Sequence, residues 1–358
     1  MKMILKNKMK NIIKINKRFV GKPYATYIVA EMSANHNQKY EDAVKIIHAA
    51  KKCGADAVKL QTYTPDTLTL NCKNKYFKIG KGTIWENYKY YDLYKEAFTP
   101  WEWQPKLKSI AYKLGMDLFS TAFDPSAVDF LENMEVSVHK IASFEIIDIP
   151  LIEYIAKTGK PLIISTGMAT LKEIQEAVQT ARNAGAREIA LLKCTSAYPA
   201  PPEEMNLRTI SHLQETFQTP VGLSDHTLGI AVPVAAVALG ACIIEKHFTL
   251  SRKMIGPDSA FSLEPDEFEK MVQAIRTAEK SIGKVHYGGS DKEFKSRVFR
   301  RSLFIIKDIK KGELFTEDNV RSIRPAYGLH PRYIKEIMGR QAKIDIKKGT
   351  PLSWDLIR

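Results

Sequence analysis

The chain has 358 residues, of which 44% are hydrophobic and 26% are charged; this is the composition of a globular protein and excludes a disordered one. The longest apolar run (229–244) contains a proline and internal glycines, so it predicts a helix followed by a strand rather than a membrane span. The net charge is +14, but half of it lies in the first eighteen residues, and basic residues are not interleaved with aromatics as on a nucleic-acid surface, so we expect no nucleic-acid or membrane partner.

Residues 1–25 form a basic N-terminal segment that lacks the apolar stretch of a signal peptide. The four cysteines show no paired spacing along the chain. Such cysteines predict reduced thiols rather than disulfides. We therefore expect a cytoplasmic protein.

From residue 26 to 285, predicted strands and helices alternate. The segments between the strands have apolar residues at helical spacing, and two of them (41–54 and 171–185) end in glycine, a common helix stop. Short apolar runs predict eight strands, at 26–32, 57–61, 117–122, 138–142, 162–167, 188–194, 221–225 and 242–248. Eight such units predict an α/β protein, with residues 26–285 forming a (β/α)8 TIM barrel that is the catalytic domain. An open doubly wound sheet is the alternative, although no glycine-rich nucleotide motif follows the first strand.

Two parts of the chain depart from this alternation. Residues 62–99 are longer than an ordinary loop, and the aromatic segment 88–103 predicts a lid or substrate wall. After a linker (286–298), the sequence Asp-Ile-Lys-Lys-Gly occurs at 308–312 and again at 345–349. The repeat predicts a small pseudo-symmetric, β-rich domain at 299–358, which we expect to pack on a barrel because so small a domain is marginal alone.

His226 and His247 lie near the ends of the last two predicted strands. Neighbouring strands run about 4.8 Å apart, and barrel enzymes place their chemistry at the carboxyl ends of the strands. Imidazole is a ligand for several divalent ions. The pair therefore predicts a metal site; the alternative is two buried histidines that hydrogen-bond their neighbours.

Lys59 and Lys140 lie inside apolar strands, where an unpaired lysine is costly. Two such cations predict a site for an anion with several charges, such as a phosphate plus a carboxylate. Hydroxyls and a glycine at strand ends would complete it; the candidates are Thr121, Ser143, Ser165, Gly167, Ser196 and Ser224. Glu31 closes the first strand, and is a candidate acid/base or ligand of a sugar hydroxyl.

Several of these residues stand in recognisable motifs: "AEMSANH" (30–36), "AVKLQTY" (57–63), "HKIASFE" (139–145), "GLSDHT" (222–227) and "EKHFT" (245–249). Together they resemble the sialic acid synthase family, and the C-terminal part resembles that family's antifreeze-like (SAF) domain. The resemblance implies a barrel enzyme that condenses phosphoenolpyruvate with an open-chain amino sugar and releases phosphate by C–O cleavage. A divalent ion would polarise the sugar aldehyde.

The resemblance also assigns roles to residues. His226 and His247 match metal ligands, with Mn²⁺ the implied ion and Mg²⁺ or Co²⁺ the alternatives. Residues matching the phosphoenolpyruvate site are Lys59, Thr121, Lys140, Ser143, Ser165 and Ser224. Residues matching the sugar site are Glu31, Gln61, Glu145, Tyr198 and Asp258. Arg324 matches an arginine of the SAF domain, which we expect to act across a domain-swapped homodimer.

Two positions depart from the N-acetylneuraminate synthases of the family: Ser196 stands in place of Asn, and Phe144 in place of Gly. Segments 91–103 and 256–265 look more like the pseudaminic acid synthase branch, whose acceptor is 2,4-diacetamido-2,4,6-trideoxy-altrose. An N-acetylneuraminate or legionaminate synthase with a manno-configured acceptor is the alternative. More remote ones are a Schiff-base aldolase with a lysine nucleophile and a non-catalytic carbohydrate-binding protein.

Overall fold

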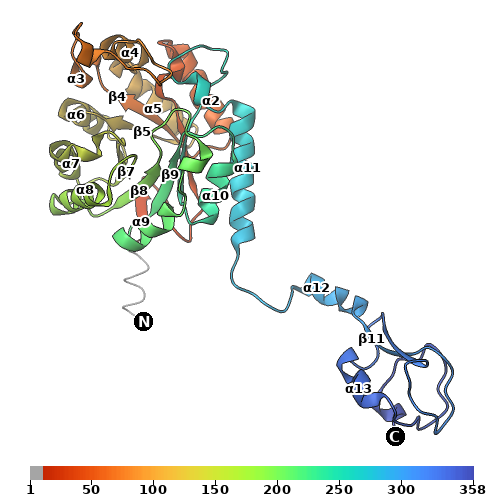
Figure 1. The fold of residues 1–358 in the computed structure, drawn as a ribbon. Helices are drawn as coiled ribbons and strands as arrows, with labels where there is room; N and C mark the ends of the chain where they lie inside the picture. The colour runs from red at the N-terminus through yellow and green to blue at the C-terminus, as the bar shows by residue number, and fades with distance from the viewer. Residues whose placement is uncertain (1–10) are drawn as a thin grey trace. The chain divides into compact units, whose positions relative to one another are not determined.

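The computed structural model describes residues 11–358, so the first ten residues of the basic N-terminal segment lie outside it. The chain divides into two compact units, Met1–Gly283 and Lys284–Arg358, which Figure 1 shows in red to cyan and in blue. None of the described helices is long and apolar enough to cross a membrane.

The larger unit contains a closed barrel of eight parallel strands, with the order β10-β3-β4-β5-β6-β7-β8-β9. The strands are β3 (Tyr27–Glu31), β4 (Ala57–Thr62), β5 (Asp117–Ala122), β6 (His139–Ile141), β7 (Leu162–Ser165), β8 (Ile189–Cys194), β9 (Val221–Asp225) and β10 (Ile243–His247). Parallel pairing of β10 with β3 closes the barrel. The predicted barrel is thus confirmed, and the open doubly wound sheet is excluded.

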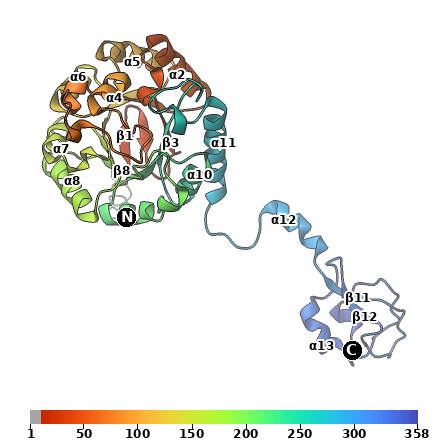
Figure 2. The same ribbon diagram turned by 45° about the horizontal axis from the view of Figure 1, so that its top comes forward.

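Helices surround the strands, as Figure 2 shows in a view into the barrel. They are α2 (Tyr40–Lys52), α5 (Gln104–Lys113), α6 (Pro125–Asn133), α7 (Ile149–Ala156), α8 (Leu171–Asn183), α9 (Thr209–Phe217), α10 (Ala231–Ala238) and α11 (Pro265–Ile282). Local sequence sets where they begin. Thr170 and Glu173 form a capping box at the start of α8, and the Asp124 side chain caps α6 immediately before Pro125.

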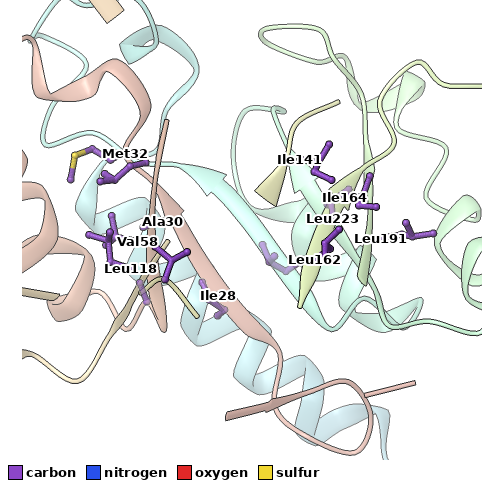
Figure 3. Close-up of a cluster of buried hydrophobic side chains, with 14 of the residues drawn as sticks. Ile28, Ala30, Met32, Val58, Leu118, Ile141, Leu162, Ile164, Leu191 and Leu223 are labelled. Carbon is purple, nitrogen blue, oxygen red and sulfur yellow. The ribbon is translucent and has the colours of Figure 1, made fainter. Parts of the chain in front are cut away.

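Side chains of the strands alternate between two apolar cores. One set faces the helices and packs with them; Figure 3 labels Ile28, Ala30, Val58, Leu118, Ile164, Leu191 and Leu223 among its members. The other set fills the barrel interior with Val29, Ala57, Phe119, Val138, Ile163, Leu192 and Ile243. The parity of each strand therefore decides which of its polar residues face the interior.

An antiparallel hairpin precedes the barrel: β1 (Ile13–Ile15) pairs with β2 (Arg18–Val20). Ile13, Ile15 and Val20 are at most 1% exposed and belong to the interior cluster. Asn16 donates to Asp117 at the start of β5. Residues 11–25, which the sequence predicted only as part of a basic segment, thus include a plug at the amino-terminal end of the barrel.

The smaller unit contains a two-stranded sheet, β11 (Ser302–Ile305) and β12 (Val320–Ile323), and the short helices α12 (Asp291–Lys295) and α13 (Ile334–Ile337). Helix α12 lies within the expected linker, which is therefore partly helical. A separate apolar core, including Leu303, Phe315, Ile337 and Leu352, holds the unit together.

The two Asp-Ile-Lys-Lys-Gly repeats bind each other reciprocally. Asp308 accepts from the backbone nitrogen of Lys348, and Asp345 accepts from that of Lys311, both at 2.8 Å. Between them, Ile309 and Ile346 exchange two backbone hydrogen bonds. The pseudo-symmetry that the repeat predicted is therefore present in the contacts.

Candidate active site

The polar side chains of the candidate site lie on the interior-facing parity of the strands, at their carboxyl ends. The register brings them together: Glu31 is paired in register with Lys59 on one side and with His247 on the other, and Thr121 with Gln61 and Lys140. Buried polar members are Glu31, Lys59, Thr121, Lys140, Ser143, Ser165, Ser224 and His247. Seven of the eight barrel strands therefore contribute to one polar layer above an apolar interior core.

Lys59 lies between two carboxylates inside the barrel. Its Nζ is 2.9 Å from Glu245 Oε1 and 3.3 Å from Glu31 Oε2. Burial opposes the charge of Lys59, but attraction to Glu245 and Glu31 outweighs burial and raises its pKa. Burial likewise opposes ionisation of Glu245, but Lys59 and Lys140 outweigh it and hold its pKa low. Lys59 and Glu245 therefore form a charged pair.

Glu31 behaves differently from Glu245. Burial raises its pKa to about 8, and the attraction of Lys59 offsets this only in part. Gln61 Nε2 donates to Glu31 Oε1 at 3.2 Å. At neutral pH the Glu31 carboxyl therefore carries a proton, which is the state required of a general acid.

Lys140 is fully buried, and its Nζ donates to Ser165 Oγ at 2.7 Å and to the Ile141 carbonyl at 2.8 Å. Burial lowers its pKa to about 8, against the attraction of Glu245. The groups that bind its ammonium directly are neutral, and the attraction of Glu245 does not offset burial, so an anion beside Lys140 would stabilise its charge. Lys140 thus supports the predicted anion site.

The chain is closely packed near Ser165, the residue that accepts from Lys140. The residues involved are Gly167, Ser143 and Ser196. Ser143 Oγ and Ser196 Oγ are 2.8 Å apart. Gly167 has φ +45°, and a Cβ there would lie 2.5 Å from Ser143 Cβ and 2.9 Å from Ser196 Oγ. Only glycine fits this close approach, so the residue is fixed by the packing of the two serines.

The imidazole rings of His226 and His247 lie 5.3 Å apart, between centroids. His226 Nδ1 donates to the Thr195 carbonyl at 2.9 Å, which fixes the tautomer that leaves Nε2 free to bind a metal. Burial and the neighbouring His226 hold the pKa of His247 well below its usual value, so His247 is neutral, as a ligand must be. The pair fits a divalent ion.

The metal donors supplied by the chain are few. Among residues 11–358, no group of three or more His, Cys, Asp or Glu side chains could hold an ion. Two imidazoles leave several coordination positions for substrate and water, which is the arrangement of a catalytic rather than a structural metal.

Three of the expected sugar residues are Tyr198, Asp258 and Glu145, and their contacts differ. The Tyr198 ring is 4.3 Å from His226, and Asp258 Oδ2 accepts from Ser33 Oγ and from the Ala34 nitrogen. Burial raises the pKa of Glu145 to about 7, and its buried Oε2 has no hydrogen-bond partner among the described residues. That oxygen is available to a ligand.

Two tryptophans of the segment 88–103 pack away from the histidine pair, and the prediction that this segment forms a lid or wall stays a prediction. Trp101 packs on Phe130 in α6, and Trp103 packs on His36 and Tyr40, so these tryptophans anchor the insertion on the helices. The insertion itself contains α3 (Pro65–Leu68) and α4 (Tyr90–Ala97).

Trp85, which precedes the aromatic segment, contacts the aromatic residues next to the histidines. Its ring centroid is 5.4 Å from that of Tyr198 and 6.3 Å from that of Phe261. Its Nε1 donates to the Pro257 carbonyl at 2.9 Å. Phe261 in turn lies 4.8 Å from His247. A continuous aromatic surface thus runs from the histidines to Trp85.

Phe144, which departs from the family pattern, is 56% exposed beside Ser143. Arg324 is exposed and directly follows β12 in the smaller unit. Its contact with a sugar therefore stays a prediction.

Sequence reasoning missed three residues of the site. Glu245 received no role from the sequence, although its spacing of two from His247 puts both on one face. Cys194 Sγ lies 3.8 Å from both His226 Nδ1 and Ser196 Oγ; its place at the end of β8 was the available signal. For Trp85 no sequence signal was available, because only the insertion's fold brings it to the histidines.

Comparisons with known proteins agree with this geometry. Residues 46–287 match the NeuB family, and residues 300–358 match the SAF domain. A pseudaminic acid synthase from Helicobacter pylori is 47% identical over 329 residues, which cover 92% of this chain and 96% of that protein. An N,N'-diacetyllegionaminic acid synthase from Legionella pneumophila is 38% identical, covering 94% of this chain and 96% of that protein.

A solved structure is similar as well. The N-acetylneuraminic acid (sialic acid) synthetase from Leptospira borgpetersenii, in complex with citrate, has a TM-score of 0.72 and 31% identity, covering 80% of this chain and 95% of that one. The resemblance drawn from the motifs is therefore confirmed.

Proposed function

The chain belongs to the NeuB family and is an enzyme, and on that premise we propose that it condenses phosphoenolpyruvate with 2,4-diacetamido-2,4,6-trideoxy-altrose to give pseudaminic acid and phosphate. One observation carries the proposal: two buried lysines, Lys59 and Lys140, lie in the same polar layer as the His226–His247 pair. An anionic donor and an aldehyde acceptor would therefore meet within one barrel.

Lys59 and Lys140 would hold the anionic groups of phosphoenolpyruvate, together with the hydroxyls of Ser143, Ser165 and Ser196. Lysines fixed by their neighbours need no reorganisation when charge develops on the phosphate. The Glu245 carboxylate keeps Lys59 protonated and in place.

Glu31 would handle the proton. As C3 of phosphoenolpyruvate forms a bond to the aldehyde carbon, the protonated Glu31 carboxyl can give its proton to the aldehyde oxygen. Water then adds at C2 and returns a proton to Glu31. In the tetrahedral intermediate the bond between C2 and the phosphate oxygen then breaks, and the C2 hydroxyl passes its proton to the departing phosphate as the ketone forms.

His226 and His247 would hold a divalent ion, with Mn²⁺ the expected one, and that ion would supply Lewis-acid polarisation of the aldehyde. The fixed tautomer of His226 and the neutral state of His247 support this assignment.

The wall formed by Tyr198, Phe261 and Trp85 supports this choice of acceptor. The trideoxy sugar has a C6 methyl and two acetamido methyls, which are apolar and suit aromatic faces. A manno-configured acceptor with a C6 hydroxyl would gain less from the same surface. The higher identity to a pseudaminic acid synthase than to a legionaminic acid synthase supports the same choice.

A homodimer completes the proposal, with Arg324 of one chain reaching the sugar site of the other. The guanidinium donates in a fixed planar geometry that matches an acetamido oxygen. Arg324 is exposed in its own unit and is therefore free for such a contact.

The test is phosphate release from phosphoenolpyruvate, measured as kcat/KM for altro- and manno-configured amino sugars. We expect the diacetamido altrose to be preferred. Preference for a manno sugar would replace the acceptor with that of a legionaminate or N-acetylneuraminate synthase. A covalent adduct trapped by borohydride with pyruvate would indicate a Schiff-base aldolase, and no turnover with any sugar would indicate a binding protein.

A further inference from the structure

Two buried residues outside the barrel interior directly precede the two histidines in the sequence. Asp225 precedes His226, and Lys246 precedes His247. Because strand side chains alternate, Asp225 and Lys246 point toward the helices when the histidines point inward. Lys246 Nζ lies 2.5 Å from Asp225 Oδ2, and neither side chain has any exposed area.

Both members of this pair also bind Thr227, the residue that follows His226. Lys246 also donates to the Thr227 carbonyl. Asp225 accepts from the Thr227 nitrogen at 3.0 Å and from the Thr227 hydroxyl at 3.2 Å. The residues on both sides of His226 are therefore tied to the strand that carries His247.

We infer that the Lys246–Asp225 pair is a positioning device that sets the spacing and direction of His226 and His247, and so sets their affinity for a divalent ion. The inference rests on the proposed function, because it takes the histidines as metal ligands. Each residue acts through its neighbour and touches no substrate.

A purely stabilising role explains the pair less well. The preceding outward positions on the same strands are Leu223 and Ile244, both buried in the outer core. A buried ion pair can often be replaced by apolar residues without loss of stability. On these two strands the outward-facing positions change from apolar to charged at Asp225 and Lys246, next to the histidines. This placement points to a role in the geometry of the histidines rather than in stability.

The test compares Mn²⁺ binding to the whole protein and to the double variant Lys246→Met/Asp225→Asn. The double variant leaves no unpaired charge, and asparagine keeps an oxygen for the Thr227 nitrogen. Binding is followed from the electron paramagnetic resonance of free aqueous Mn²⁺, and thermal unfolding is measured in chelator. We expect Mn²⁺ affinity to fall by about tenfold or more, the usual effect of residues that orient metal ligands, with little change in the unfolding temperature.

The matched control is Arg276→Met. Arg276 donates to the Thr26 carbonyl and to Glu279 at the amino-terminal end of β3, so its loss disturbs barrel packing at the end away from the histidines. We expect unchanged Mn²⁺ affinity in this variant.

The outcomes separate the two proposals. If the wild-type protein binds no Mn²⁺, the metal role itself fails. If the wild type binds Mn²⁺ and the folded double variant binds it equally well, the positioning role is overturned. If the double variant does not fold, Lys246→Arg is measured in its place, because it keeps the charge but moves the hydrogen-bond donors. Weaker Mn²⁺ binding by Lys246→Arg supports the inference, and unchanged binding overturns it.

Discussion

Lys59 Nζ lies 2.9 Å from Glu245 Oε1 in the barrel interior, and each side chain is only 6% exposed. Glu31 Oε2 is 3.3 Å from the same ammonium group. One buried cation thus faces two carboxyl groups whose pKa values differ. The pKa of Glu245 is held low, so it is ionised, and the pKa of Glu31 is raised to about 8, so it keeps its proton at neutral pH.

Lys59→Met should both inactivate and destabilise the protein. It leaves the buried Glu245 carboxylate without its partner, and breaking a buried pair in this way costs about 3–5 kcal/mol. Urea unfolding measures the loss of stability. The control Lys59→Met/Glu245→Gln should regain much of the stability but none of the activity; recovery of activity would exclude Lys59 from catalysis.

The rate with limiting phosphoenolpyruvate should fall as pH rises above about 8. The pKa of Lys140 is lowered by burial to about 8 and that of Glu31 is raised by burial to about 8, so both lose a proton in this range. Lys140 then loses the charge that binds the anion, and Glu31 loses the proton that it donates. The profile of kcat/KM reports these groups in the free enzyme.

The stability of the wild type should fall relative to that of Glu31→Gln as pH rises from about 4.5 to about 8. With its pKa raised, Glu31 stabilises the fold below its unfolded value of about 4.5, and this stability is lost as pH rises through about 8. Glu31→Gln has no carboxyl at this position, so its stability should not show this fall with pH. For the rate, a flat profile of kcat/KM between pH 7 and 9.5 would contradict the roles assigned to Lys140 and Glu31.

Activity should require a divalent ion. Chelation should abolish turnover, and Mn²⁺ should restore it. His226→Ala removes one of two protein ligands and should lower the rate by at least ~10²-fold, given the several kcal/mol that a Lewis acid supplies. Full activity in excess chelator would eliminate the metal from the mechanism.

Trp85→Ala should weaken use of the sugar but not of phosphoenolpyruvate. Trp85 lies at the far end of the aromatic surface from the histidines, and loss of an apolar contact of this kind lowers kcat/KM by about tenfold or more. Tyr76→Ala is the matched control, because Tyr76 belongs to the same insertion and is 76% exposed. Equal effects of the two substitutions would remove Trp85 from the sugar site.

Arg324→Ala should raise KM for the sugar far more than KM for phosphoenolpyruvate. Arg321→Ala, on an exposed arginine of β12, should not. Co-expression of Arg324→Ala with His226→Ala tests whether the arginine acts across the dimer: a mixed dimer then contains one intact site, and activity returns. No rescue would place Arg324 within its own chain's site.

Much of the fold could be predicted because local patterns report local structure. Continuous apolar runs marked the eight strands, and helical spacing of apolar residues with glycine stops marked the helices between them. The repeated Asp-Ile-Lys-Lys-Gly marked the small domain. The hairpin at residues 13–20 was missed because its apolar residues are too few to stand out among lysines, and only the barrel interior makes them a core.

The sequence by itself determined which residues could carry chemistry. Lysines inside apolar strands and histidines at strand ends are unfavourable without a partner or a ligand, because burial penalises their charge. Only the tertiary structure decided how they act. Barrel closure brings Glu31 of the first barrel strand and Glu245 of the last to the same Lys59 ammonium group. In that setting the pKa of Glu245 is held low and the pKa of Glu31 is raised. Charge states depend on distances between strands far apart in the chain, which no local pattern contains.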